Sequence, residues 1–343
     1  MNALSPHRRL AVRAAVPRDG QAIRAFIVAH PEATPFHLPE WSAGVERGCG
    51  ARGHCLLAED SRARIVGILP LTEVRSPLFG SAMVSAGFGV GGGVLGLGAD
   101  ALGEAAWSLA RRRNCASVEL RGGPAPMRWQ RNEGVYAGFA RALPADEEAV
   151  LAAIPRKQRA EVRRALGFGL DVAVGRDLEA HYRAYSESVR NLGTPVFPRA
   201  LFAAMLEAFG EDADILTVSR GGEVLASVLS LYFRGTVYPY WGGGTREARP
   251  ARANELMYYA LMRHAVRRGC TRFDFGRSKL GTGAFAFKKN WGFEPQPLVY
   301  AVKGEARETN PLSPRYRLQV AAWKKLPLWL ANRLGPPLAR GLG

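Results

Sequence analysis

The chain has 343 residues, 47% of them hydrophobic, and a formal net charge of +17 at pH 7. This length allows about two domains of 100–200 residues each, and the composition excludes a disordered or low-complexity protein. Such an excess of positive charge attracts polyanions. We therefore expect an anionic partner, which could be RNA, a nucleotide-linked substrate or an anionic membrane surface.

Hydrophobic periodicity predicts an alternation of strands and helices in the first half of the chain. The expected order is a strand, two helices, three strands, a helix and a strand, at 10–16, 19–29, 38–47, 54–59, 64–75, 81–88, 100–113 and 117–120. A continuous basic helix is expected next, at 145–166.

The second half repeats this order. The expected elements are a strand at 170–174, helices at 177–189 and 198–209, three strands within 214–241, a helix at 253–268 and a strand from Phe273. Together with a closing helix and strand, this is the order of the GNAT acyltransferase fold. We expect an α/β (α+β) protein with two such domains in tandem, at 1–143 and 144–303, and a basic tail at 304–343. Each domain would have a mixed, mainly antiparallel sheet flanked by helices.

Repeated segments indicate that one domain was duplicated. RRNCASVEL at 112–120 aligns with RRGCTRFDF at 267–275, an offset of 155 residues (270 minus 115). In the same order, VGILPL at 66–71 corresponds to ASVLSL at 226–231, and glycines 91–93 correspond to glycines 242–244. The offsets drift by a few residues, as changes in loop length would cause.

The N-terminal segment and the cysteines favour a cytoplasmic location. The segment carries arginines but no continuous apolar core before a cleavage site, so it does not resemble a signal peptide. No stretch reaches the ~18 apolar residues of a membrane span. The four cysteines and six histidines are scattered without metal-ligand spacing, so we expect no metal.

The densest group of aromatic and charged residues lies at 273–295, FDFGRSKLGTGAFAFKKNWGFEP. Its alternation predicts a half-buried strand, a glycine turn and a short helix. Lys279, Lys288 and Lys289 could converge on one anion, which Arg277 could hold with two hydrogen bonds. The alternative is a core of aromatics with solvated lysines.

Two glycine motifs point away from the usual nucleotide cofactors. GFGVGG at 87–92 fits a dinucleotide fingerprint, but it does not open a helix after a parallel strand. RALGFG at 164–169 fits the R-x-x-G-x-G of coenzyme A enzymes, but it closes a helix. The loop where that motif belongs reads GGGTREARPARAN at 242–254, so acetyl-coenzyme A is disfavoured.

Several segments together resemble the FemAB-like transferases. They are FDFGRSK, TG-x-x-x-FKK-x-WGFEP, GGG followed by AN-x-L-x-Y, and NLGTPVFP at 191–198. The chain is more narrowly similar to the branch associated with exosortase and PEP-CTERM loci, which shares a NP-x-x-x-R tail ending in W-K-x-LP and LGP. The resemblance implies tandem GNAT-like domains, with most of the active face in the second.

The family's better-studied members transfer an amino acid from aminoacyl-tRNA to an amine of a peptidoglycan precursor. Lys288 corresponds to the lysine of their Phe-Lys motif. This sequence lacks the coiled-coil insertion of the staphylococcal type, which puts tRNA as the donor in doubt. We expect an aminoacyl or acyl transferase that forms an amide on a cell-envelope or exopolysaccharide precursor. Its donor would be aminoacyl-tRNA or an acyl thioester, with no further cofactor.

The catalytic candidates are Lys288, for the developing oxyanion or an adjacent phosphate, and Asp274, as the base for the acceptor amine. The alternative for Asp274 is an ion pair with an arginine. Substrate contacts are expected from Arg277, Ser278, Lys279, Lys289, Trp291, Tyr240, Trp241, Asn254, Asn191, Thr194, Arg163 and Arg164. Their alternatives are sheet packing, a helix cap and a solvated helix face.

Two other functions stay open: an acyl-coenzyme A N-acyltransferase, and an inactive GNAT-like protein that binds anionic polymer or membrane. The tail interleaves Trp323, Leu326 and Trp329 with cations. It could contact the inner membrane face or dock on the protein's own body.

Overall fold

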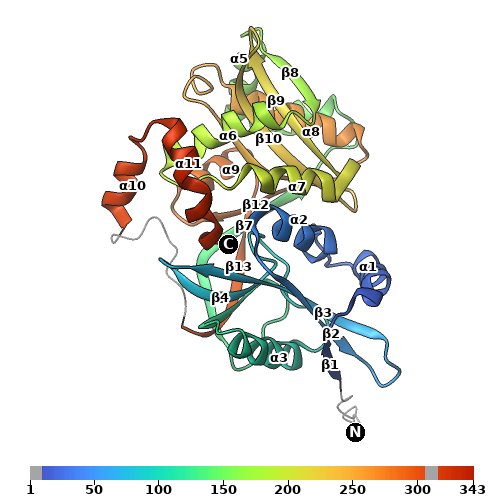
Figure 1. Ribbon diagram of the computed structural model, residues 1–343. Coiled ribbons are helices and arrows are strands. Elements are labelled where there is room, and N and C mark those ends of the chain that lie inside the picture. Colours follow the sequence, from blue (N-terminus) through green and yellow to red (C-terminus); the bar gives the residue numbers. More distant parts are fainter. Residues whose placement is uncertain (1–9, 306–315) are drawn as a thin grey trace.

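The computed structural model describes residues 10–305 and 316–343. The first half of the chain, blue to green in Figure 1, follows the predicted order closely. Its elements are β1 (Ala11–Ala14), α1 (Gly20–Ala29), α2 (Pro39–Cys49), β2 (Gly53–Glu59), β3 (Ile65–Ser76), β4 (Gly80–Ser85), β5 (Leu95–Gly96), α3 (Ala99–Arg112), β6 (Ser117–Arg121) and β7 (Gln130–Ala142).

The second half begins with two short helices and then repeats the order of the first. Its elements are α4 (Ala149–Ala153), α5 (Arg156–Leu166), β8 (Asp171–Gly175), α6 (Leu178–Leu192), α7 (Arg199–Phe209), β9 (Ala213–Arg220), β10 (Glu223–Phe233), β11 (Thr236–Gly244), α8 (Ala253–Arg267), β12 (Arg272–Lys279), α9 (Gly283–Asn290) and β13 (Pro295–Gly304). The tail adds α10 (Arg317–Trp323) and α11 (Leu328–Ala339).

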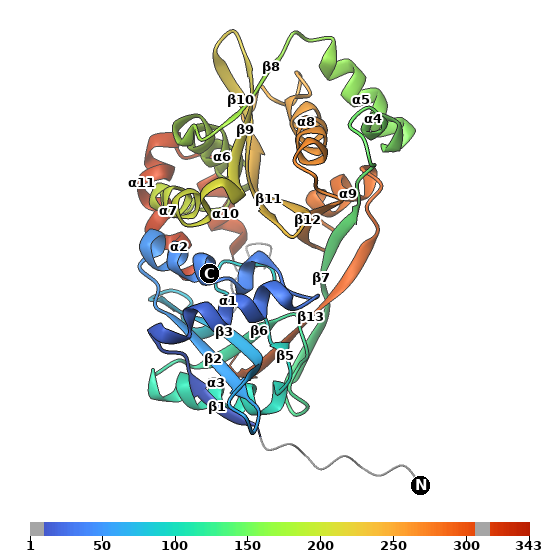
Figure 2. The same cartoon turned by 90° about the vertical axis from the view of Figure 1, so that its right-hand side faces the viewer.

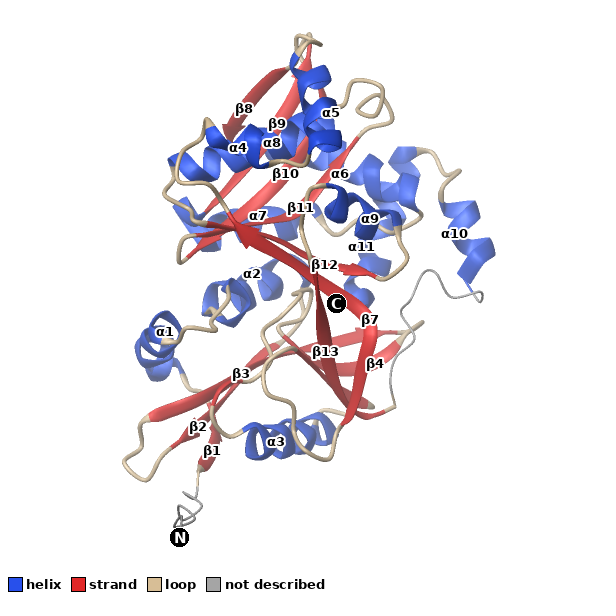
Figure 3. Ribbon diagram, turned by 180° about the vertical axis from the view of Figure 1, so that it is seen from behind, coloured by secondary structure: helices blue, strands red, loops and turns tan. Residues whose placement is uncertain are grey.

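The described strands form one sheet in the order β1-β2-β3-β4-β6-β13-β7-β12-β11-β10-β9-β8, with β5 beside β3. Most neighbours are antiparallel, and the pairs β4–β6 and β11–β12 are parallel. This arrangement confirms the predicted α/β class with a mixed, mainly antiparallel sheet. Helices flank the sheet in both halves (Figure 3).

Each half contributes its last strand to the other half. β7, from the first half, pairs with β12, while β13, from the second, pairs with both β6 and β7. The two long strands run side by side across the centre of the molecule (Figure 2). Backbone hydrogen bonds therefore make one sheet of the two repeats.

Two local predictions need correction, and the two halves differ in one element. The basic helix is broken into α4 and α5 at Pro155, because a proline and the residue before it disfavour a continuous helix. The strand predicted at 81–88 ends at Ser85, since Ala86 and Phe88 adopt positive φ angles of 41° and 66°. Among the described residues, the first half has no helix between β6 and β7, where the second has α9.

The two halves also share an apolar core. In α2, Gly48 lies so close to Leu201 of α7 that an added Cβ would be 2.3 Å from the Leu201 Cα. Trp41 of α2 is fully buried and stacks on Trp241 of β11, with ring centroids 5.7 Å apart. Glycine on one helix lets the second approach closely, so this contact fixes the halves relative to each other.

The tail folds back onto the body. Arg190 of α6 donates to the Leu326 carbonyl oxygen at 3.1 Å, and the Asn332 side chain donates to Ser186 Oγ at 3.3 Å. The motif NP-x-x-x-R, at 310–315, lies outside the described residues. None of the helices in the described ranges combines the length and apolarity needed to cross a bilayer.

Candidate active site

The sheet opens between β11 and β12. These parallel strands pair only at Thr236 with Arg272 and at Val237 with Phe273. Beyond that point β12 keeps its antiparallel partner β7 but has no further pairing with β11. β11 also carries a bulge: Trp241 pairs with Leu229 and Pro239 with Ser230, which leaves Tyr240 between them. Bulges redirect a strand and are common beside active sites.

β12 has a bulge of its own at the same place. Asp274 pairs with Ala140 and Arg277 with Gly138, so two residues of β12 stand opposite Phe139 alone. Gly276 adopts a φ of 65°, which a glycine tolerates without steric cost. Its backbone N–H donates to Asp274 Oδ1 at 2.8 Å. The turn of the backbone at Gly276 thus holds the carboxylate beside the opening.

Lys288 is held against this bulge by α9. Thr282 caps the helix by accepting a hydrogen bond from the Phe285 N–H at 3.3 Å. Lys288 Nζ donates to the carbonyl oxygens of Phe275 at 2.7 Å and Arg277 at 2.8 Å, with a longer contact of 3.4 Å to that of Gly276. The ammonium group therefore uses its hydrogen bonds on the backbone of β12.

Burial shifts the pKa values of Lys288 and Asp274. It lowers the pKa of Lys288 to about 7, against the opposing effect of Asp274. Burial likewise raises the pKa of Asp274 above its ordinary 3.8, and the Gly276 N–H and the cations Arg272 and Lys288 act in the opposite direction. The pKa values of both groups are thus shifted toward neutral pH, as general acids and bases require.

Arg277 joins the site to the first half of the chain. Its guanidinium lies 4.7 Å from the Tyr136 ring centroid and 5.7 Å from that of Tyr300, and it donates to Tyr300 Oη. Tyr300 Oη in turn donates to the Val90 carbonyl oxygen at 3.4 Å. Two aromatic faces hold the arginine in place, and the glycine-rich loop at 86–93 lies next to it.

The predicted site residues divide into groups. Asp274, Arg277 and Lys288 come together, while Lys289 is exposed on α9. No described contact joins the Lys279 side chain to this group; it is half-buried at the end of β12. The structure therefore does not bring Lys279, Lys288 and Lys289 together at one point, in contrast to the prediction.

Other candidates lie in the core. Trp291 and Trp241 are 0% and 3% exposed, and Ser278 is 6% exposed, so none of them faces an open groove. Tyr240 donates to the Phe88 carbonyl oxygen at 2.6 Å. Asn254 packs against Gly244 and leaves no room for a side chain there.

The remaining candidates are on other elements. Arg163 and Arg164 are exposed on α5, where Arg164 pairs with Glu161 at 2.7 Å. Asn191 lies in the last turn of α6, and Thr194 lies beside the tail. In contrast, no sequence motif pointed to Tyr136, Tyr300 or Phe139. They reach the site on β7 and β13, which meet β12 only in the folded sheet.

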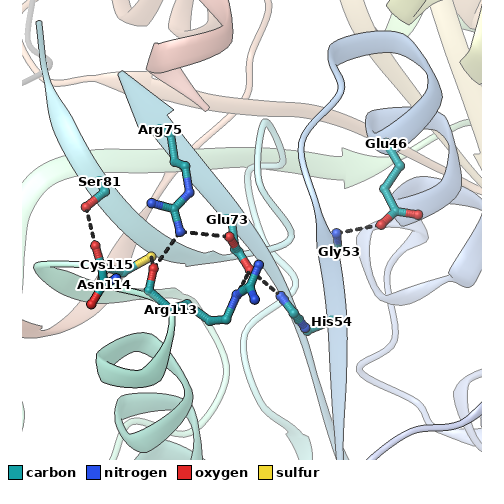
Figure 4. A network of polar contacts seen from close by, with 9 residues as sticks. All are labelled: Glu46, Gly53, His54, Glu73, Arg75, Ser81, Arg113, Asn114 and Cys115. Atoms are coloured by element: carbon teal, nitrogen blue, oxygen red, sulfur yellow. Dashed lines mark hydrogen bonds and ion pairs between the residues drawn. The ribbon is translucent and has the colours of Figure 1, made fainter. Parts of the chain in front are cut away.

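A second buried charge lies in the first half, shown in Figure 4. Glu73 of β3 accepts from Arg113 at 2.6 Å, Arg75 at 3.1 Å and His54 at 2.8 Å. Burial raises its pKa, but these three partners outweigh burial and lower it to about 2. Glu73 thus remains ionised and fully paired, which suits a structural contact rather than proton transfer.

Cavity size does not mark the site. One cavity, of about 650 Å³, lies in the first half between α2 and α3. A second, of about 450 Å³, lies beside the tail. Lys288 lines neither. The candidate site is the opening between β11 and β12, because Asp274 and Lys288, whose pKa values are shifted by burial, lie there. The described residues hold no cluster suited to a metal ion.

Known proteins share this architecture. Residues 153–289 match the acetyltransferase (GNAT) domain family. FemX is similar over 84% of this chain and 96% of its own, with a TM-score of 0.61 and 16% identity. A tandem GNAT protein from the clavulanic acid biosynthesis pathway matches over 86% and 98%, with a TM-score of 0.56 and 15% identity. L-PGS from Bacillus licheniformis matches over 92% and 99%, with a TM-score of 0.53 and 13% identity. No curated protein matches the sequence.

The matches confirm the predicted tandem GNAT-like fold. The matched segment at 153–289 contains Asp274, Arg277 and Lys288. The second half therefore matches a GNAT acetyltransferase domain over 153–289, and this match supports acyl transfer as the reaction class.

Proposed function

We propose that this protein transfers an aminoacyl or acyl group to an amine of a cell-envelope or exopolysaccharide precursor and forms an amide. The observation that carries the proposal is the buried pair of Asp274 and Lys288 at the opening between β11 and β12. Amide formation needs a base for the attacking amine and positive charge near the carbonyl oxygen. This pair offers both.

In the proposed reaction, the acceptor nitrogen attacks the carbonyl carbon of an activated ester or thioester. A C–N bond forms, the C–O or C–S bond of the donor breaks, and Asp274 takes the proton that the amine loses. The leaving oxygen or sulfur then receives a proton from Asp274. Lys288 acts through its charge and by fixing the bulge, because the backbone of β12 occupies its N–H groups.

The donor we propose is an aminoacyl-tRNA or an acyl thioester. The formal net charge of +17 supports an anionic donor or acceptor. So do the exposed cations of α5, Arg156, Lys157, Arg163 and Arg164. The resemblance to FemAB-like transferases of exosortase and PEP-CTERM loci supports an envelope polymer as the acceptor. For the same reason we propose contact with the inner membrane face, where lipid-linked precursors are assembled.

Mass spectrometry of envelope and polysaccharide precursors tests the proposal. Cells that lack the protein would be complemented with the wild-type chain, Lys288→Met or Lys289→Met. We expect one precursor to gain a single aminoacyl or acyl unit with the wild type and Lys289→Met, but not with Lys288→Met. A precursor profile identical in all strains would count against the proposal.

Calorimetric titration of the purified protein separates the donors. Heat on adding acyl-coenzyme A, together with turnover, would favour the acyl-coenzyme A alternative, which the GNAT match at 153–289 keeps relevant. Transfer from aminoacyl-tRNA without such binding would favour the aminoacyl donor.

A further inference from the structure

The tail covers an apolar cavity on the side of the body. We call it the tail cavity; its volume is about 450 Å³, within the range of about 300–1,000 Å³ of small-molecule sites. The described lining residues contain no charged side chain. They are Leu78, Phe79, Gly193, Thr194, Pro195, Tyr316, Gln319, Val320, Trp323, Leu338 and Leu342.

The surface around the tail cavity exposes large apolar side chains. Leu318 on α10 is 82% exposed, Trp329 on α11 is 69% exposed, and Leu78 between β3 and β4 is 67% exposed. Isolated exposed apolar residues are common, but these lie on or beside elements that line one apolar cavity. α10 stands at the edge of the molecule, away from the sheet (Figures 1 and 3). Nothing else in the described chain covers its outer side.

From residue 316 onward, the charged side chains of the tail are all positive. Residues 316–343 contain five cations and neither aspartate nor glutamate; the cations are Arg317, Lys324, Lys325, Arg333 and Arg340. All five are exposed. A cationic surface with exposed tryptophan and leucine is typical of proteins that lie on an anionic bilayer. The contacts of α11 with the rest of the protein explain why one side of this helix is buried. They do not explain why the tail exposes large apolar side chains and cations on its other side.

We propose that the tail rests on an anionic phospholipid bilayer and that the tail cavity takes one hydrocarbon chain of a phospholipid. Most of this lining is apolar, so a nucleotide or sugar would leave most of its polar groups without partners, whereas a hydrocarbon chain needs none. The cations remain outside, where they meet phosphate groups. Charge complementarity therefore selects the headgroup and the apolar lining selects the chain.

The indole N–H of Trp323 is a polar group in the otherwise mainly apolar lining of the tail cavity. Trp323 lines the cavity, and its indole Nε1 is covered by protein without a hydrogen-bond partner among the described residues. Tryptophan suits the boundary between hydrocarbon and headgroups because its ring is apolar and its N–H is a donor. It is also a fluorescent reporter for a chain that enters the cavity.

The inference deepens the proposed membrane contact and rests on it, but it does not depend on the reaction at Lys288. A bilayer-bound tail would hold the enzyme where a lipid-linked acceptor lies. Because the test measures binding alone, its failure would leave the transferase proposal untouched.

Vesicle flotation with the full chain tests the surface. We expect binding to phosphatidylcholine vesicles that contain phosphatidylglycerol, and much weaker binding to phosphatidylcholine alone or in high salt. Reversing both charges in Lys324→Glu/Lys325→Glu should weaken binding at least about 30-fold, since each basic residue near the surface contributes about a factor of five. The matched control Arg156→Glu/Lys157→Glu reverses an exposed pair at the start of α5 and should bind like wild type. Equal binding of both double variants would overturn the proposed surface.

Fluorescence quenching tests the cavity. Vesicles with brominated acyl chains should quench tryptophan emission in the wild type, and Trp323→Phe should lose a larger part of the quenching than Trp329→Phe. Both variants should still float with anionic vesicles. If Trp323→Phe binds normally but loses no more quenching than Trp329→Phe, the chain-binding site is overturned, and absence of binding to anionic vesicles would overturn the whole inference.

Discussion

Glu119 and Asp274 occupy matching positions in the two halves, 155 residues apart (274 minus 119), yet their surroundings differ. In the first half, pairing between the parallel strands β4 and β6 continues through Glu119, opposite Val84. In the second, pairing between β11 and β12 stops at Phe273, one residue before Asp274. Glu119 pairs with Arg121 on its own strand at 2.7 Å and remains 30% exposed, whereas burial raises the pKa of Asp274.

The segments that follow these strands explain the difference. After β6 the chain runs through 122–129 without a helix, whereas after β12 it forms α9, which carries Lys288. The duplicated sheet thus provides the same frame twice. One added helix and one earlier divergence of strands distinguish the second copy, where Asp274 and Lys288 form the proposed acid–base pair.

The sharpest test of this comparison exchanges each carboxylate for its amide. Asp274→Asn removes the proposed base and should lower kcat/KM by about 10²–10⁴-fold, while Glu119→Gln should leave it unchanged. In the wild type, activity should fall as the pH drops through the raised pKa of Asp274, so the acid limb should lie above pH 3.8. The measurement is a pH–rate profile of amide formation. Similar losses in both variants would remove the distinction between the halves.

Lys288 and its neighbour Lys289 allow a buried and an exposed lysine to be compared on the same helix, α9. Lys288→Met keeps the length of the side chain but removes the charge that the β12 carbonyls hold, and it should lower kcat/KM by about 10²–10³-fold. Lys289→Met changes an exposed lysine on the same helix and should have little effect. Steady-state kinetics with circular dichroism as a folding control would decide. Equal activity of the two variants would assign the catalytic charge elsewhere.

Glu73 should behave in the opposite way, with a large effect on stability and none on the chemistry. Glu73→Gln leaves Arg113 and Arg75 without their buried partner, and should lower the free energy of unfolding by about 2–3 kcal/mol. The wild type should lose this contribution as the pH falls from about 4.5 toward 2, because the folded-state pKa lies below the ordinary value. Urea unfolding at several pH values measures both. Glu119 is more exposed than Glu73, at 30% against 4%, and the amide of Glu119→Gln can still accept a hydrogen bond from Arg121, so this variant should cost less.

The sequence predicted most of the architecture because the relevant signals are local. Alternating and helical periodicities placed the strands and helices, and the repeat of RRNC and RRGC placed the two copies in register. The exchange of β7 and β13 between the halves could not be predicted in this way. A strand pattern specifies which faces are buried, but not which neighbouring strand supplies the hydrogen bonds.

The same limit applies to the site. Asp274, Arg277 and Lys288 could be predicted together because they belong to one strand, turn and helix within 15 residues (288 minus 274, plus one). Aromatics in that segment could be either core or groove, and Trp291 is core. Tyr136 and Tyr300, which hold Arg277, are far away in sequence and have no motif. Only the exchanged strands bring them to the site.

The smallest effect should come from the titration of Lys288 itself. Its folded-state pKa, about 7, lies below the ordinary 10.5, so between these values the unfolded chain binds more protons than the folded one. The free energy of unfolding should therefore rise with pH through this window. Relative to Lys288→Met, the wild type should gain about 1–2 kcal/mol between about pH 7 and 9, measured by urea unfolding of both proteins. Comparing them removes the contributions of other titrating groups. Parallel pH profiles would mean that the carbonyl oxygens of Phe275 and Arg277 keep the lysine charged, and its role would then be that of a fixed cation only.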